Sequence, residues 1–258
     1  MKRVLLVPAA GLGSRLQTEI PKLLFPINGT AMIDYLFRLY APFVDRFVLV
    51  LNPAHVAAVR SHCEKFDLPI EFEIQETPTG MLDAILIPQT RLGEFLNEEA
   101  DQVWITWCDQ IAVQTQTVQR LSVLSEDSSG VVMPTVVKGR PYIHWVRNRS
   151  NEIVGLLQRR EGDAMPERGE GDVGLFSLSR KAYFDLLPRF ASEAGVGNRT
   201  EERNFLPFIV WLSGKADVMT FSVRTEIESV GINDRADVAL IESYLNGKTQ
   251  ADNSYSGV

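Results

Sequence analysis

Cysteine is scarce in this sequence, and positive charge is in deficit. The only cysteines, Cys63 and Cys108, are too few for the disulfide framework of a small secreted domain, so we expect a reducing, cytoplasmic location. The formal net charge of −7 argues against a nucleic-acid-binding protein, which usually presents a basic surface. We therefore expect no nucleic-acid partner.

Long apolar runs are missing as well. No stretch approaches the roughly 20 apolar residues that span a bilayer, so we expect no membrane partner. Met1-Lys2-Arg3 and the apolar residues up to Pro8 are too short for the apolar region of a signal peptide. The histidines form no zinc-binding spacing with the cysteines, and no Gly-x-Ser-x-Gly elbow is present. The sequence thus gives no support to zinc or serine hydrolase chemistry.

The first half of the chain alternates between strand and helix patterns. Apolar, β-branched runs predict strands at 4–7, 47–51, 70–74 and 103–106. Helical patterns follow them at 31–40, 54–66, 80–95 and 115–125, with Thr79 as a candidate cap. Such alternation is typical of right-handed crossovers, so we predict an α/β fold with a mostly parallel, Rossmann-like sheet flanked by helices.

The second half is richer in strands. Strands are predicted at 131–137, 142–147, 153–158, 174–178 and 217–223. Helices are predicted at 181–190, 204–212 and 235–245. The charged, glycine-rich segment 159–171 predicts a mobile loop. We expect one domain over residues 1–246, in which a β-rich extension covers the site, followed by a polar tail at 247–258.

The segment after the first strand carries the clearest chemical signal. Its small residues are Ala9, Ala10, Gly11, Gly13 and Ser14. Small residues let backbone N–H groups approach phosphates closely, and Arg15 and Lys22 add two positive charges. Leu16 stands where a dinucleotide-binding loop has its third glycine, and no Gly-Lys-Ser/Thr of a Walker A loop follows. We interpret this segment as a triphosphate cradle of a different kind.

This segment, together with Pro21-Lys22-x-Leu24, resembles the signature of nucleotidyltransferases that couple a sugar 1-phosphate to a nucleoside triphosphate. The likeness is strongest to the uridylyltransferase domain of bacterial N-acetylglucosamine-1-phosphate pyrophosphorylases. It covers most of the chain, because segments 74–80, 107–109 and 230–233 also match. The resemblance implies a nucleotide-binding half at about 1–128 and a sugar-binding half at about 129–246.

The resemblance also implies roles for individual residues. Gln75 and Gly80 match the segment that reads the base, which is uracil in these relatives. Asp109 and Asn233 match the residues that hold Mg²⁺. Their chemistry agrees with this, because Mg²⁺ prefers oxygen ligands and an open α/β sheet binds its ligands at the carboxyl ends of its strands.

The implied reaction needs no protein nucleophile. The phosphate of a sugar 1-phosphate is already an anion near neutral pH, since its second pKa is about 6. We expect Arg15 to stabilise the leaving β- and γ-phosphates, and Lys22 to stabilise the α-phosphate and the attacking group. Asp109 is the third expected catalytic residue, through the metal.

The sugar-facing half departs from the family pattern. We expect Tyr142, Gln158 and Asp172 to bind the sugar, but the family has Tyr-Gly-Arg where this chain has Tyr142-Ile143-His144. Gln158 replaces a glutamate, and Asp172-Val173-Gly174 replaces Asn-Thr-Gly. These exchanges alter hydrogen bonds to sugar hydroxyls and leave the identity of the sugar open.

Several readings stay open at this stage. The nucleotide can be CTP rather than UTP, because a glutamine side chain presents either a donor or an acceptor, and the acceptor can then be a sugar phosphate or an alcohol phosphate. Asp109-Gln110 also resembles the molybdenum-cofactor guanylyltransferases. A non-catalytic sugar-nucleotide sensor is the alternative from another class. The sequence gives no indication of oligomeric state.

Overall fold

The structure is a computed structural model that describes residues 1–11, 16 and 20–255, with side chains up to residue 247. The strands are β1 (Arg3–Ala9), β2 (Pro26–Ile27), β3 (Thr30–Ala31), β4 (Arg46–Leu51), β5 (Ile70–Ile74), β6 (Gln102–Thr106), β7 (Val131–Gly139), β8 (Ile143–Arg147), β9 (Ile153–Gln158), β10 (Arg168–Asp172), β11 (Leu175–Ser179) and β12 (Val218–Ser222). The α-helices are α1 (Met32–Tyr40), α2 (Val56–Cys63), α3 (Met81–Leu86), α4 (Gln89–Phe95), α5 (Thr115–Leu124), α6 (Leu187–Glu193), α7 (Pro207–Leu212) and α8 (Arg235–Tyr255).

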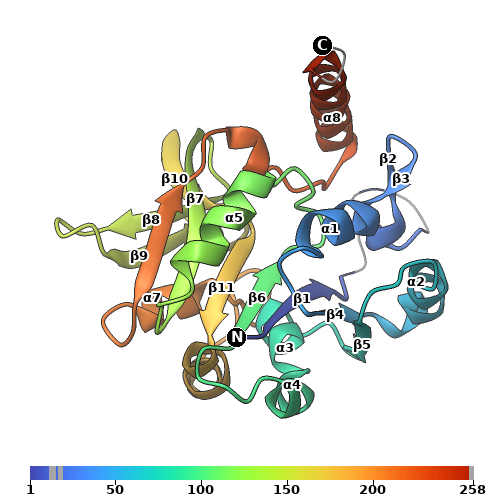
Figure 1. Ribbon diagram of the computed structural model, residues 1–258. Helices are drawn as coiled ribbons and strands as arrows, with labels where there is room; N and C mark the ends of the chain where they lie inside the picture. The colour runs from blue at the N-terminus through green and yellow to red at the C-terminus, as the bar shows by residue number, and fades with distance from the viewer. Residues whose placement is uncertain (12–15, 17–19, 256–258) are drawn as a thin grey trace.

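One large sheet organises the described part of the chain (Figure 1). Its eight strands follow the order β10-β7-β11-β6-β1-β4-β5, with β12 paired to β7. Strands β5, β4, β1 and β6 are parallel, whereas β11 runs antiparallel between β6 and β7. The prediction of an α/β fold with a mostly parallel, mixed sheet flanked by helices is confirmed. The second half of the chain extends the sheet that the first half begins.

Alternating side chains of the central strands supply two apolar cores, one on each face of the sheet. In β1, Leu5 and Val7 face the core formed with α1, α2, α5 and α8, and Val4 and Leu6 face the core formed with α3, α4, α6 and α7. All four side chains are at most 1% exposed. Burial on both faces explains why β1 reads as a continuous apolar run rather than an alternating one.

Several predicted helices differ from the helices of the structure. The helix expected at 80–95 is divided into α3 and α4 at Pro88, which has no N–H to continue the first helix. Gly80, rather than Thr79, holds the N-cap position of α3, without a side-chain capping bond. The helix expected at 181–190 begins as a π-helical turn at Ala182–Leu186 and continues as α6.

The prediction of a loop at 159–171 was wrong for its last residues, which form β10 from Arg168 onward. This strand pairs antiparallel with β7, although its sequence, Arg-Gly-Glu-Gly-Asp, has no strand pattern. A Cβ atom at Gly171 would lie 2.9 Å from the carbonyl oxygen of Ile143, so glycine lets β8 approach β10 closely. Arg147 of β8 also forms an ion pair with Glu170, with Nε 2.6 Å from Oε2. Tertiary pairing therefore outweighs the local propensity.

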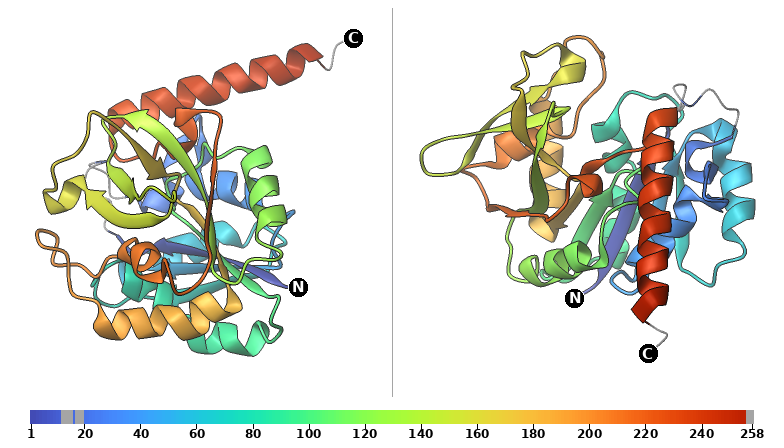
Figure 2. Two further views of the ribbon diagram at one scale, coloured as in Figure 1. Left: turned by 90° about the vertical axis from the view of Figure 1, so that its left-hand side faces the viewer. Right: turned by 90° about the horizontal axis from the view of Figure 1, so that it is seen from above.

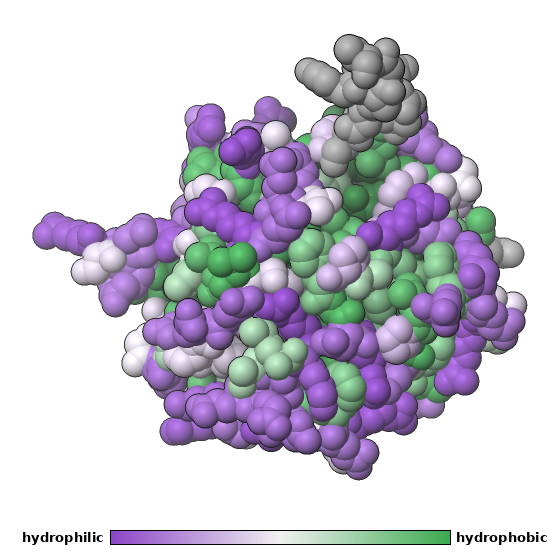
Figure 3. All heavy atoms as spheres, viewed as in Figure 1, coloured by the Kyte–Doolittle hydropathy of each residue, from purple (hydrophilic) through white to green (hydrophobic). Residues whose placement is uncertain are grey.

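The hairpin of β8 and β9 forms the β-rich extension, which projects at the left of Figure 1. Helix α8 continues ten residues beyond the predicted end at residue 245 and extends away from the body of the molecule (Figure 2). On the face shown in Figure 3, hydrophilic residues cover most of the surface and apolar residues form small patches between them. In the described part of the chain, no helix has both the length and the apolar character needed to cross a bilayer.

Candidate active site

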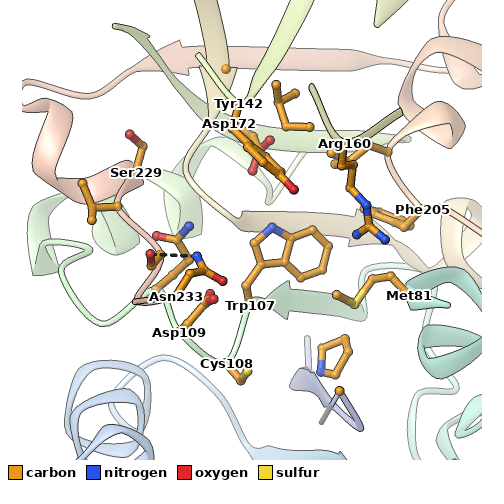
Figure 4. Close-up of a pocket in the computed structure, with 18 of the residues that line it drawn as sticks. Met81, Trp107, Cys108, Asp109, Tyr142, Arg160, Asp172, Phe205, Ser229 and Asn233 are labelled. Carbon is orange, nitrogen blue, oxygen red and sulfur yellow. Dashed lines mark hydrogen bonds between the residues drawn. The ribbon is translucent and has the colours of Figure 1, made fainter. Parts of the chain in front are cut away.

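A cavity of about 780 Å³ opens at the carboxyl ends of β1 and β6, where an open α/β sheet normally binds its ligands. Its lining combines residues of both halves of the chain. Ala9 and Gly11 come from the end of β1, and the segment 107–110 follows β6. Figure 4 shows Trp107 between Asp109 and Asn233 on one side and Tyr142 and Asp172 on the other.

Three side chains from distant parts of the sequence meet on the first side. The ammonium group of Lys22 donates to Asp109 Oδ2 at 2.5 Å and to Asn233 Oδ1 at 3.2 Å. Lys22 opens a 3-10 turn after Pro21, Asp109 follows β6, and Asn233 lies just before α8. The side chains of Lys22 and Asp109 are only 16% and 14% exposed, so water screens this ion pair less than a surface pair.

The segment that carries Asn233 is fixed against Asp109 by its backbone. Ile232 N donates to the carbonyl oxygen of Asp109 at 3.2 Å. Asn233 Nδ2 donates to Gly231 O at 2.9 Å, which orients the amide so that its oxygen faces Lys22. A Cβ atom at Gly231 would lie 3.1 Å from Asp109 Oδ1, so a side chain there would crowd the carboxylate.

Asp109 and Asn233 carry oxygen atoms of the kind that could coordinate a magnesium ion. Their carboxylate and amide oxygens converge on a single cationic group, the Lys22 ammonium, and such oxygens are the ligands that Mg²⁺ takes. Among residues with described positions, no three His, Cys, Asp or Glu side chains gather into a potential metal cluster. Two oxygen donors leave the other positions of such an ion to water and phosphate oxygens, which Mg²⁺ commonly keeps in its shell.

The other side of the cavity combines aromatic surface with buried polar groups. The ring of Trp107 packs against Phe176 and Phe205, with centroids 5.3 and 6.1 Å away. The carboxylate of Asp172 accepts a hydrogen bond from Gly174 N at 2.7 Å. Burial raises the pKa of Asp172, although this bond, the charge of Lys138 and the indole N–H of Trp107 oppose the shift.

Lys138 connects the two sides. Its ammonium donates to Ser229 Oγ at 2.8 Å and to Ser229 O at 3.2 Å. Burial lowers the pKa of Lys138, and the nearby charges of Asp172 and Glu226 counteract part of that effect. The contact ties β7 to the segment that leads to Asn233.

Cys108 lines the cavity beside Asp109, and burial raises the pKa of its thiol to about 12. The nearby Lys22 ammonium lowers this pKa in part, whereas Asp109 raises it. A thiol with this pKa is protonated at neutral pH, so Cys108 does not supply a thiolate nucleophile.

The structure brings most of the predicted site residues together. Ala9 and Gly11 line the cavity, as do the predicted sugar-binding residues Tyr142, Gln158 and Asp172. Ala10 is 4% exposed and is absent from the lining. Three predicted residues of the loop, Gly13, Ser14 and Arg15, lie outside the described residues.

The two predicted base-binding residues contact each other. Gln75 Nε2 donates to the carbonyl oxygen of Gly80 at 3.1 Å, and Gln75 is 6% exposed. Neither residue is among the described residues that line the cavity. The role of this pair in base recognition stays a prediction.

Sequence reasoning overlooked several polar cavity residues. Lys138, Arg160 and Gln110 line the cavity, but no motif at the level of sequence marks Lys138 or Arg160. A signal for Gln110 was present, because it directly follows the aspartate that ends the β6 segment.

The fold and the cavity together define the class of this protein, a nucleotidyltransferase. The chain belongs to the family described as the MobA-like NTP transferase domain, whose model matches residues 5–198. The predicted resemblance to nucleotidyltransferases is thereby confirmed.

Curated relatives and a solved structure agree with this assignment. The bifunctional protein GlmU of Mycolicibacterium paratuberculosis is 25% identical over 280 residues, covering 98% of this chain and 52% of that protein. GlmU of Pseudomonas putida is 22% identical over 245 residues, covering 93% of this chain and 51% of that protein. The crystal structure of HddC from Yersinia pseudotuberculosis has a TM-score of 0.65 at 17% identity, covering 95% of this chain and all of that one, and shows the shared fold. The chain spans about half the length of the curated relatives it matches.

Proposed function

We propose that this protein transfers a nucleoside monophosphate from a nucleoside triphosphate to a sugar 1-phosphate, releasing pyrophosphate in a Mg²⁺-dependent reaction. The observation that carries the proposal is the meeting of Lys22, Asp109 and Asn233 beside the small residues Ala9 and Gly11. UTP is the expected nucleotide, on the resemblance of the segment around Gln75. The half up to about residue 128 takes the nucleotide and the half from about 129 to 246 takes the sugar.

The chemistry rests on positioning and charge. The acceptor phosphate, with a second pKa of about 6, is itself the nucleophile at neutral pH. Its oxygen forms a bond to the α-phosphorus, the bond to the β-phosphate oxygen breaks, and pyrophosphate leaves. Lys22 offsets the charge of the α-phosphate and the attacking oxygen, and Arg15 is proposed to do the same for the leaving group.

Asp109 and Asn233 would hold the metal for this reaction. Bound Mg²⁺ supplies further neutralisation of the phosphate oxygens. The bond of the Asn233 amide to Gly231 directs the amide oxygen to the same side as the Asp109 carboxylate, where both accept from Lys22.

The sugar is proposed to lie between Trp107 and Tyr142, whose rings offer flat apolar surface. Asp172 and Gln158 offer polar groups for its hydroxyls. Tyr142 is 44% exposed, so its ring is accessible to a ligand that enters the cavity.

Pyrophosphate release tests the proposal. Each common nucleoside triphosphate is combined with a series of sugar 1-phosphates and alcohol phosphates, with Mg²⁺ and with a chelator. We expect turnover with UTP and a sugar 1-phosphate that the chelator abolishes. Turnover confined to CTP and an alcohol phosphate would instead support the cytidylyltransferase reading, and no turnover with any pair would contradict the proposal.

A further inference from the structure

Buried polar atoms without hydrogen bonds are rare, and each calls for a physical explanation. In the described part of the chain four side-chain atoms are of this kind: Glu71 Oε2, Gln110 Oε1, Trp145 Nε1 and Ser177 Oγ. Of these four residues, only Gln110 lines the cavity. Its carbonyl oxygen is thus a buried acceptor without a partner, on a residue of the cavity wall.

The backbone and its neighbours fix the place of Gln110. The residue is 7% exposed, and its N–H donates to Trp107 O at 3.2 Å, which closes the turn after β6. Gly174 packs directly against both side chains, since a Cβ atom there would lie 2.6 Å from Gln110 Cγ and 2.5 Å from Trp107 Cδ1. Asp172 is two residues before this glycine and accepts a hydrogen bond from its N–H. Gln110 thus belongs to the wall proposed to bind the sugar.

We propose that Gln110 is a specificity-determining residue for the acceptor, whose hydroxyl group donates a hydrogen bond to Gln110 Oε1. Asp172 lies on the same wall and also offers oxygen atoms, so the wall calls for a molecule with several hydroxyl donors. The acceptor is then a polyhydroxylated phosphate ester rather than a plain alkyl phosphate. This inference rests on the proposed function and adds to it a residue that selects the acceptor.

The unpaired oxygen predicts opposite effects on stability and on activity. In the free protein, replacing Gln110 with methionine removes a buried polar group without a partner and keeps a side chain of similar length. Such a change is neutral or stabilising. In the complex, the same change removes the acceptor for the substrate hydroxyl. A residue that served only the fold would lower stability and activity together.

The test compares wild type, Gln110→Met and the control Gln116→Met, which places the same substitution on the exposed face of α5. The acceptors are the best sugar 1-phosphate of the pyrophosphate assay and its monodeoxy analogues, each lacking one ring hydroxyl. Steady-state kinetics and calorimetric binding are measured for each acceptor, together with the KM for the triphosphate and the Tm.

With the wild-type protein, we expect kcat/KM for one monodeoxy analogue to be about ten- to a hundredfold lower than for the parent acceptor. In Gln110→Met, kcat/KM for the parent acceptor falls by a similar factor, and removing that one hydroxyl from the acceptor lowers it no further. The Tm of this variant stays the same or rises. The KM for the triphosphate stays unchanged, and Gln116→Met behaves like wild type.

Each of the following outcomes would overturn the inference. An equal loss on the parent and on every analogue, with a lowered Tm, would make Gln110 a structural residue. A raised KM for the triphosphate would place it at the nucleotide. Wild-type activity and binding in Gln110→Met would remove it from recognition. If the wild type shows no turnover, the proposed function is contradicted, and calorimetric binding of the acceptor then tests the role of Gln110 by itself. If the wild type binds no acceptor, both the proposed function and the role of Gln110 are contradicted.

Discussion

The Lys22 ammonium and the Asp109 carboxylate lie 2.5 Å apart although 87 positions separate them in the sequence. Asn233 Oδ1 faces the same ammonium, so a lysine from one end of the chain is held by oxygens from its middle and its far end. Both charges are largely shielded from water, so removing one leaves the other partly uncompensated. The arrangement fixes one positive charge beside the cavity and keeps two oxygens directed at it.

Replacing Lys22 with methionine tests this positive charge. We expect kcat to fall by about 10²–10³-fold, because the ammonium acts on charge that builds up in the transition state. The KM for the triphosphate should change much less. Steady-state kinetics measure both values, with Lys181→Met, an exposed lysine, as the control. An unchanged kcat in Lys22→Met would remove this residue from the chemistry.

Replacing Asp109 with asparagine tests the proposed metal site by a measurement that needs no turnover. Mg²⁺ bound to the folded state raises the Tm, and at a hundredfold excess over its Kd the gain is about 2.7 kcal/mol. We expect Asp109→Asn to lose the Mg²⁺-dependent rise in Tm, in the presence of nucleotide. Lys22→Met keeps both oxygen ligands and should retain the rise. An Asp109→Asn protein that responds to Mg²⁺ like wild type would rule out this site.

Gly231→Ala tests the close packing of the last loop on Asp109. The added methyl group would stand 3.1 to 3.2 Å from the atoms of the Asp109 carboxyl group, tighter than an ordinary contact. We expect a displaced carboxylate and a loss of about tenfold in kcat, since small misplacements of catalytic groups are costly. Gly139→Ala is the matched control, because nothing lies within 4 Å of a Cβ there. Equal kinetics of the two variants would show that the loop adjusts freely.

Strands could be predicted from the sequence where a strand's own residues carry the apolar pattern. The bounds of β5 and β9 agree with the prediction to the residue, because short apolar runs end at turn-forming residues. The strand β10 could not be predicted in this way. Its pairing depends on β7 and on the close approach of Ile143 to Gly171, and neither neighbour is visible in the five residues themselves.

The same distinction applies to the site. Lys22, Asp109 and Asn233, which meet in the structure, could be predicted as a group because each belongs to a short motif with its own spacing. Lys138 was missed, since its contact with Ser229 joins residues 91 positions apart and depends on how β7 meets the last loop. Gln110 was noted beside Asp109 but was not predicted as a site residue, because a buried atom that lacks a partner is a property of the packed structure only.

The pH dependence of acceptor binding tests Asp172. Burial raises the pKa of its carboxyl group, so the proton returns at a higher pH than for an exposed aspartate, whose pKa is about 3.9. If the ionised form accepts hydroxyl protons of the sugar, the acceptor KM rises as the pH falls toward that raised pKa. We expect Asp172→Asn to reduce this rise, and the part that remains comes from protonation of the acceptor phosphate, whose second pKa is about 6. Acceptor KM values measured from about pH 8 down to about pH 4.5 check it, and identical profiles in both proteins would exclude the role.

The stability of the loop at 197–204 is expected to depend on Glu161. Its carboxylate accepts hydrogen bonds from Thr200 Oγ1 at 2.7 Å, from Arg199 N and Asn204 Nδ2 at 3.0 Å, and from Thr200 N at 3.4 Å. Burial alone would raise the pKa of Glu161, but these donors lower it to about 2. Asn204 also lines the cavity, so the same carboxylate helps to hold a site residue in place.

Because the pKa of Glu161 is lower in the folded than in the unfolded state, its stabilising effect is complete above the ordinary glutamate pKa of about 4.3. The effect is lost as the pH falls from there toward about 2. We expect Glu161→Gln to cost about 2 kcal/mol at neutral pH, since the amide presents N–H groups to donors and loses the charge. Urea unfolding at neutral and at acidic pH measures this difference, which should shrink below about pH 4. Glu64→Gln, at an exposed position of the chain, is the control and should change stability little at either pH. A Glu161→Gln deficit that stays constant with pH would show that shape, rather than charge, holds the loop.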